Sequence, residues 1–283
     1  YFPRLLNLYS YVKFFKHLQK EQFDVVHTHQ PRSDFMYFIL NFFTSFKPTW
    51  IVSIHGKYDT YLEGSLFFDK LRKLSMPLLV KIWNKSDHII CISEEVEKWL
   101  TLYKIKSRTS VINYWINNAK LENLGKTKES INIGFMGRIN RNKGIEDLLE
   151  VHEELNKDRY SLFIAGSGKE SYLKKLNDRY DLKNVNFLGY ISNKDKFFSN
   201  IDIFVFPSYS EGLGLALLES MSYSKICISR DVPPMNSILN HNSGYLFQNI
   251  EELKSIILDC GHLYKEDLLS LNKKLSNQYN LLN

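Results

Sequence analysis

The stretch INIGFMGRINRNKGIEDLLEV, residues 131–151, connects a short apolar run to a helical pattern through a basic loop. The apolar run, residues 131–136, is typical of a strand that is buried on both faces of a sheet. The helical pattern continues to residue 155 and places Ile145, Leu148, Leu149 and Leu155 on one face. A buried strand followed at once by an amphipathic helix predicts one βα unit of a parallel sheet.

The same alternation of apolar runs and helical patterns extends along most of the chain. The strand candidates in the first part are DVVHTH, WIVSIHG, HIICIS and TSVIN, and those in the second are INIGFMG, SLFIAG, VNFLGY, IFVFPS, KICIS and GYLF. This alternation predicts an α/β protein with parallel sheets wound by βαβ units. Six strands suffice for a doubly wound sheet in the second part, whereas four strands make the first sheet incomplete.

A polar and charged segment, NNAKLENLGKTKESI at residues 117–131, separates the two series of strands. Segments of this composition are typical of connections between domains. We therefore expect a partial N-terminal domain over residues 1–125 and a C-terminal domain over residues 126–283. The length of 283 residues is enough for each domain to have a core of its own.

The composition is that of a soluble globular protein, with 44% hydrophobic and 24% charged residues. The longest apolar run, FMYFILNFF at residues 35–43, is too short to span a bilayer. The cysteines, Cys91, Cys227 and Cys260, are far apart in the sequence, which suits a reducing compartment. We therefore expect a cytoplasmic location.

The positive charge lies in the first part of the chain. Residues 1–125 contain 17 Lys and Arg against 11 Asp and Glu, whereas the remainder contains 20 against 20. An excess on one side can draw a protein to an anionic membrane surface, although a solvated basic surface explains it equally well. The basic residues accompany no nucleic-acid-binding motif, so we expect no nucleic acid partner.

Two glutamates stand eight positions apart in PSYSEGLGLALLESM, residues 207–221. We expect Glu211 in a loop after a buried strand and Glu219 about one turn inside the helix that follows. Gly212 and Gly214 allow the backbone to turn tightly and to approach a ligand closely. Ligands collect at the carboxyl edge of open parallel sheets, and helix starts attract anions. The alternative is that both glutamates are ordinary helix-start or surface acids.

This region resembles the Glu-x7-Glu region of the retaining family-4 glycosyltransferases, which have the GT-B fold of two Rossmann-like domains. IGFMGRINRNKGIEDLLEV is similar to that family's strand, basic loop and helix, and FIAGSG, VNFLGYIS and SGYLF follow in the family's order. The resemblance covers about residues 24–246. It implies a transferase that moves a sugar from a nucleotide-diphosphate donor to a hydroxyl group with retention of anomeric configuration.

The resemblance also assigns roles to individual residues. Arg138 and Lys143 would neutralise the donor diphosphate, Glu211 would bind sugar hydroxyls near the anomeric carbon, and Glu219 would bind the ribose hydroxyls. The remaining donor-binding residues that it implies are Gly212, Leu213, Gly214 and Leu215, through their backbone N–H groups, and Ile191 and Lys196 near the nucleotide. An isolated Arg or Lys is more often a solvated surface cation, and only the surrounding motif favours a binding role.

Histidines gather at the ends of two predicted strands of the first part. The resemblance implies that His55, before Gly56, contacts the donor sugar or takes part in transfer, whereas a lone histidine at a strand end is more often structural. His27 and His29 have a metal-like spacing, but we find no third ligand and interpret them as structural or cleft-lining. The sequence contains no Asp-x-Asp motif, so we expect transfer without a metal.

The resemblance, together with the absence of an Asp-x-Asp motif, leads us to expect a metal-independent retaining glycosyltransferase, with catalytic residues His55 and Glu211 and no cofactor besides the nucleotide sugar. We expect it to act in bacterial surface polysaccharide or glycolipid synthesis. The acceptor would be a glycan or lipid-linked glycan, and residues 1–20 would form either a basic helix at the inner membrane face or a helix packed on its own domain.

Two alternatives remain at this stage: a non-catalytic nucleotide-sugar-binding partner protein, and a GT-B nucleotide-sugar epimerase. Members of the family also open with a strand and a glycine-rich loop that this sequence does not contain. We therefore expect that the chain lacks the natural N-terminal start.

Overall fold

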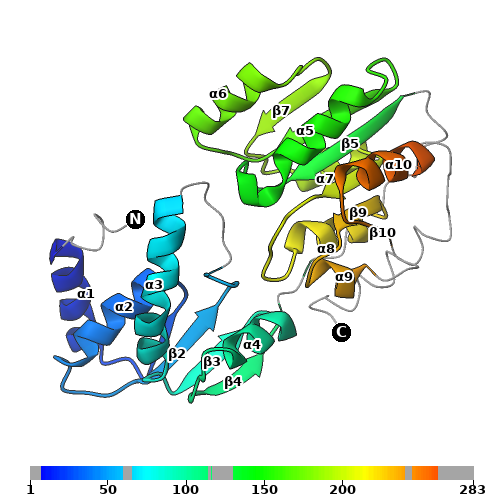
Figure 1. Ribbon diagram of the computed structural model, residues 1–283. Coiled ribbons are helices and arrows are strands. Elements are labelled where there is room, and N and C mark those ends of the chain that lie inside the picture. Colours follow the sequence, from blue (N-terminus) through cyan, green and yellow to red (C-terminus); the bar gives the residue numbers. More distant parts are fainter. Residues whose placement is uncertain (1–7, 60–65, 114–115, 117–129, 240–243, 261–283) are drawn as a thin grey trace. The chain divides into compact units, whose positions relative to one another are not determined.

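The computed structural model describes residues 8–59, 66–113, 116, 130–239 and 244–260. These residues form two compact units, one ending at Asn113 and the other containing the described residues from 116 onward. The expected boundary between residues 125 and 126 lies outside the described residues. Each unit is built from helices and one parallel sheet (Figure 1).

The first unit has a four-stranded parallel sheet in the order β1-β2-β3-β4. The strands are β1 (Val25–Thr28), β2 (Thr49–Ile54), β3 (His88–Cys91) and β4 (Arg108–Val111), and the helices are α1 (Leu8–Glu21), α2 (Pro31–Asn41), α3 (Leu66–Trp83) and α4 (Glu94–Thr101). All four strands were predicted from the sequence and are confirmed. Their core contains Trp50 and Trp83, which are fully or almost fully buried.

The second unit has a six-stranded parallel sheet in the order β10-β9-β8-β5-β6-β7. The strands are β5 (Ile131–Met136), β6 (Tyr160–Ala165), β7 (Val185–Gly189), β8 (Ile203–Phe206), β9 (Ile226–Arg230) and β10 (Tyr245–Phe247). The helices are α5 (Ile145–Glu154), α6 (Glu170–Arg179), α7 (Lys194–Asn200), α8 (Leu215–Ser222), α9 (Met235–Ile238) and α10 (Ile250–Cys260). The predicted apolar face of α5 is buried in this unit's core.

The order of these six strands is that of a Rossmann fold. The first three strands of the unit, β5 to β7, run toward one edge, and the next three, β8 to β10, run toward the other. The direction of winding therefore reverses between β5 and β8, which pair directly through Ile133 and Ile203. In open α/β sheets, ligands bind outside the carboxyl ends of the strands at this switch point.

The predicted fold class, α/β with two domains built on parallel sheets, is confirmed. The six-stranded sheet is doubly wound as predicted, whereas the four described strands of the first sheet follow one another in sequence order. The three cysteines are free and buried, as small apolar side chains are. None of the helices in the described part of the chain is both long and apolar enough to cross a membrane.

Candidate functional site

The loops after β5 (residues 137–144) and after β8 (residues 207–214) interlock at the switch point of the second sheet. The backbone N–H of Tyr209 donates to the carbonyl oxygen of Asn142 at 2.9 Å. The side-chain amide of Asn142 in turn donates to the carbonyl oxygen of Ser210 at 3.1 Å. Asn142 is fully buried, so these two bonds hold the loops against each other out of contact with solvent.

Gly144 makes this close approach possible. Its φ of +65° lies in the left-handed region, and a Cβ atom there would stand 2.1 Å from the carbonyl oxygen of Pro207. Only glycine lacks the atom that would collide, and only glycine adopts this backbone conformation without a steric cost. The same glycine precedes Ile145, the first residue of α5, so it sets the start of the helix as well.

The structure brings two of the predicted site residues, Lys143 and Glu211, into direct contact. The ammonium of Lys143 donates to Oε1 of Glu211, and the two side chains are only 13% and 12% exposed. The Lys143 ammonium also lies 5.8 Å from the centre of the Phe206 ring. One cation from the first loop is thus paired with one carboxylate from the second, at the place where a ligand of an open sheet binds.

Arg138 lies in an extended part of the first loop and is exposed. The N–H of Gly137 donates to the carbonyl oxygen of Ala165, and that of Ile139 to Ser167, both at 2.9 Å. These bonds continue the β5–β6 pairing beyond the strand ends and fix the backbone on both sides of Arg138. Arg138, which we predict to bind phosphate, therefore lies at the carboxyl edge of the sheet in a segment whose backbone is fixed by hydrogen bonds on both sides.

The second loop leads into α8 as the sequence predicted. Gly214 has a φ of 79° and precedes Leu215, the first residue of the helix. Leu213 is buried and anchors the loop, whereas Gly212 is half-buried and Leu215 is exposed. Glu211 lies in the loop and Glu219 lies inside the helix, so the predicted placement of both glutamates is confirmed.

Lys194, which the sequence analysis did not single out, lies beside Glu219. The Lys194 ammonium donates to Oε1 of Glu219 at 2.5 Å. Lys196 is exposed, and its backbone N–H donates to the side chain of Asn193, the residue that caps α7. Ile191, the other predicted nucleotide neighbour, is half-buried in the segment before α7.

Sequence reasoning also missed a buried cation, Arg230, at the end of β9. Its guanidinium is paired with Asp147 of α5, and Nε donates to the carbonyl oxygen of Pro207 at 3.1 Å. The guanidinium lies 4.1 Å from the ring centre of Tyr209, whose hydroxyl donates to Asp147 at 2.7 Å. Arg230 therefore holds the second loop against α5. A single arginine after a strand gives no sequence signal for such a contact.

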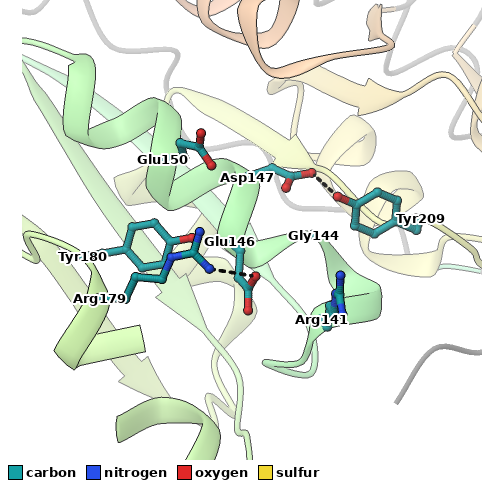
Figure 2. Close-up of a pocket in the computed structure, with 8 residues that line it drawn as sticks. All are labelled: Arg141, Gly144, Glu146, Asp147, Glu150, Arg179, Tyr180 and Tyr209. Carbon is teal, nitrogen blue, oxygen red and sulfur yellow. Dashed lines mark hydrogen bonds and ion pairs between the residues drawn. The ribbon is translucent and has the colours of Figure 1, made fainter. Parts of the chain in front are cut away.

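A polar pocket lies beside the two loops, over the first turns of α5 (Figure 2). Its lining residues are Arg141, Gly144, Glu146, Asp147, Glu150, Arg179, Tyr180 and Tyr209. Two of its carboxylates are already engaged, Glu146 by Arg179 and Asp147 by Tyr209. None of the predicted donor-binding side chains lines it, so we do not assign the pocket to the predicted site.

Three histidines of the first unit, His27, His29 and His55, gather at the carboxyl ends of β1 and β2. Nδ1 of His29 lies 3.2 Å from Nε2 of His55, and the rings of His27 and His29 are 4.0 Å apart. Burial lowers the pKa of His55, and the two neighbouring histidines lower it further. The described residues contain no group of three side chains arranged to hold a metal ion.

Comparison with known proteins identifies the class of protein. The family model described as glycosyl transferases group 1 matches residues 117–274, more than half of the chain. The model of Glycosyltransferase Family 4 matches residues 1–120. The chain therefore belongs to the group 1 glycosyl transferases, and its two α/β units have the architecture of GT-B glycosyltransferases.

Two curated relatives and one solved structure illustrate the likeness. The O-antigen biosynthesis glycosyltransferase WclY of Escherichia coli is 24% identical, over 77% of this chain and 63% of the relative. The alpha-monoglucosyldiacylglycerol synthase of Streptococcus pneumoniae is 26% identical, over 84% of this chain and 59% of the relative. The chain thus spans less than two thirds of either protein's length.

The solved structure is that of Anabaena HepE in complex with UDP-glucose. It has a TM-score of 0.80 and 16% identity, and the match covers 96% of this chain and 78% of that one. At this identity the likeness shows the fold alone.

Proposed function

We propose that this protein is a retaining glycosyltransferase that transfers a sugar from a nucleoside diphosphate to a hydroxyl group of a glycan or lipid-linked glycan. The observation that carries the proposal is the Lys143–Glu211 contact at the switch point of the second sheet. It brings an ammonium group and a carboxylate side by side, and both side chains are mostly shielded from solvent. These are the two groups that a nucleotide sugar needs at the phosphate and at the sugar.

The proposed donor would compete with Glu211 for Lys143. A diphosphate has more negative charge than one carboxylate, so Lys143 and Arg138 would bind the phosphates and stabilise them as they depart. Glu211 would then accept hydrogen bonds from sugar hydroxyls, and the N–H groups of residues 212–215 would contact the phosphates. No cofactor and no metal enter this scheme.

Glu219 would bind the ribose at the other end of the donor. It lies eight positions after Glu211 and inside α8, so the two carboxylates can contact opposite parts of one extended ligand. His55 of the first unit remains our proposed contact to the donor sugar. Catalysis would rest on positioning and on stabilisation of the leaving diphosphate, because the scheme includes no side-chain nucleophile.

The biological role that we propose is synthesis of a bacterial surface polysaccharide or glycolipid. It is supported by the similarity of this chain to enzymes of O-antigen and glycolipid synthesis. The basic first part of the chain supports an acceptor that lies at an anionic membrane on the cytoplasmic side.

Nucleotide binding tests the proposal most directly. We would measure the binding of UDP, GDP and ADP to this chain and to Glu219→Ala by ligand-observed NMR. We expect one nucleotide to bind, and the substitution to weaken it about tenfold or more because a charged hydrogen bond is lost. If the folded protein binds none of the three, the donor-site proposal fails.

A product assay with donor alone then separates transfer from the two alternatives. A transferase without an acceptor gives at most slow hydrolysis of the donor. Formation of an epimer would point to a nucleotide-sugar epimerase instead. Binding with no reaction, even when glycan acceptors are added, would point to a non-catalytic partner protein.

A further inference from the structure

We infer that Lys194 is a positioning residue of the nucleotide site, which holds the Glu219 carboxylate for the ribose and makes the site prefer ribonucleoside to 2′-deoxyribonucleoside diphosphates. The inference rests on the proposed function, because it takes Glu219 as the residue that binds the ribose. It adds a residue that the sequence did not single out and a chemical class of donor.

The contact between the two side chains is directional. Lys194 donates to Oε1 of Glu219 at 2.5 Å, which leaves Oε2 to accept from a ligand. The side chain of Glu219 is 21% exposed and that of Lys194 is 48% exposed. A pair that is this open to water contributes little to folding stability, but it still restricts the orientation of the carboxylate.

The two helices that supply the pair are held together by a separate contact. Tyr223, at the end of α8, donates its hydroxyl to Asp195 in the first turn of α7. The ring of Tyr223 also stacks on Phe198 of α7, with the ring centres 4.4 Å apart. Because Asp195 directly follows Lys194, this contact fixes the start of α7 beside α8. Lys194 therefore contacts Glu219 from the start of a helix whose position relative to α8 is fixed.

A carboxylate held in one orientation distinguishes ligands by their hydroxyl groups. A site built to bind a hydroxyl group rejects the analogue that lacks it, because the polar group of the protein loses its partner. If Lys194 occupies one oxygen of Glu219, the other is available for the ribose, and loss of the 2′-hydroxyl removes a donor. The expected result is a preference for ribonucleotides that depends on Lys194.

Lys174 of α6, in the same unit, provides a control. It is an exposed lysine to which we assign no role in donor binding. Replacing Lys174 by alanine changes the net charge of the unit by the same amount without touching Glu219. A larger effect of the Lys194 substitution is therefore not caused by the change in net charge.

The experiment is calorimetric titration of the full chain with UDP and 2′-deoxy-UDP, and with GDP and 2′-deoxy-GDP. The variants are Lys194→Ala, Lys194→Arg, Lys174→Ala and Glu219→Ala, with unfolding midpoints measured to confirm that each folds. We expect Lys194→Ala to weaken ribonucleotide binding about tenfold and deoxyribonucleotide binding less, because the deoxyribonucleotide has one hydroxyl group fewer to lose. We expect Lys194→Arg to restore the preference and Lys174→Ala to behave as the unsubstituted protein.

Two results would overturn the inference in different ways. If the unsubstituted protein binds a ribonucleotide through Glu219, but Lys194→Ala and Lys174→Ala have equal effects, Lys194 has no positioning role and the proposed function still stands. If the unsubstituted protein binds no nucleoside diphosphate, the proposed function and this inference fail together.

Discussion

The contact between Asp147 and Arg230 is the residue pair on which the position of the second loop depends. The two side chains are only 14% and 10% exposed. We expect Arg230→Met to lower the free energy of unfolding by about 3–5 kcal/mol, because it leaves a buried carboxylate without its cation. Equilibrium denaturation in urea measures this loss.

The double variant Arg230→Met/Asp147→Leu is the control for this pair. Removing both charges avoids an unpaired buried group, so most of the lost stability should return. We do not expect nucleotide affinity to return with stability, since Arg230 also donates to the carbonyl oxygen of Pro207 in the second loop. A double variant as unstable as the single one would contradict the assigned role of the pair.

His152 of α5 makes the second unit sensitive to acid. The side chain is fully buried, and this burial, together with nearby Lys157, lowers the pKa of His152 to about 4. Below the usual pKa of about 6.5 the unfolded chain takes up a proton that the folded chain does not, so stability falls as the pH falls. Between about pH 7 and pH 4.5 this group alone should remove about 2 kcal/mol.

The measurement is urea unfolding at both pH values for the unsubstituted protein and for His152→Gln. Carboxylates titrate in the same range in both proteins, so the difference between them isolates the histidine. The variant should lose about 2 kcal/mol less on acidification. Equal losses in the two proteins would show that His152 is not the group responsible.

Lys194 and Lys196 show why the sequence predicted the site only in part. The motif predicted Arg138, Lys143 and the two glutamates, because loop and helix positions follow from the glycines and apolar runs around them. In NKDK the resemblance singled out Lys196 and not Lys194, since the sequence alone does not show where α7 begins. The cap at Asn193 sets that start, and with it the lysine that reaches Glu219.

At the scale of elements, Gly144 connects a strand end, a helix start and the neighbouring loop. We expect Gly144→Ala to destabilise the protein by more than the roughly 1–2 kcal/mol that the left-handed backbone costs an alanine. The added methyl group would stand 2.1 Å from the carbonyl oxygen of Pro207 and would push apart the loops after β5 and β8. Nucleotide affinity should fall together with stability.

Gly189 is the matched control for this substitution. Its φ of +64° is nearly the same, but a Cβ atom there would meet nothing within 4 Å. Gly189→Ala should therefore lower the free energy of unfolding only by the cost of the left-handed backbone, and it should leave nucleotide binding unchanged. Denaturation and nucleotide titration of both variants give the separate cost of the clash, and equal losses would show that the loops do not depend on close approach.

The ten strands of the described residues were all predictable, because each is a short apolar run between polar turns. Their order within the sheets was not. The Rossmann order of the second sheet places β8 beside β5, although about 70 residues separate them in the sequence. The contacts of Asn142, Gly144 and Lys143 with the second loop follow from that neighbourhood, so local sequence patterns could not reveal them.

At the scale of the whole molecule, the charge is divided between the two parts of the chain. Residues 1–125 contain the entire net charge of +6. Within the first unit, α1 is anchored by Leu18, which is 1% exposed, while Lys13, Lys16 and Lys20 are exposed. The helix therefore packs on its own unit and presents a basic surface at the same time.

This basic face leads us to expect binding to anionic membranes. Tyr9 and Val12 are also exposed on α1, at 74% and 45%, and can enter the interface between headgroups and acyl chains. Each lysine near an anionic surface contributes about 1 kcal/mol, so replacing Lys13, Lys16 and Lys20 by Glu should weaken binding at least about a hundredfold. Cosedimentation with phosphatidylserine-containing vesicles measures the effect.

The control replaces three exposed lysines of the second unit, Lys169, Lys174 and Lys183, by Glu. It changes the net charge by the same amount. If the α1 substitutions weaken vesicle binding more than the control does, the membrane-binding surface is therefore on α1. Binding should also be lost on vesicles of phosphatidylcholine alone and at about 0.5 M salt, where the Debye length is much shorter than at physiological ionic strength. Equal effects of the two triple variants would mean that the membrane responds to net charge only, and that α1 is not the contact.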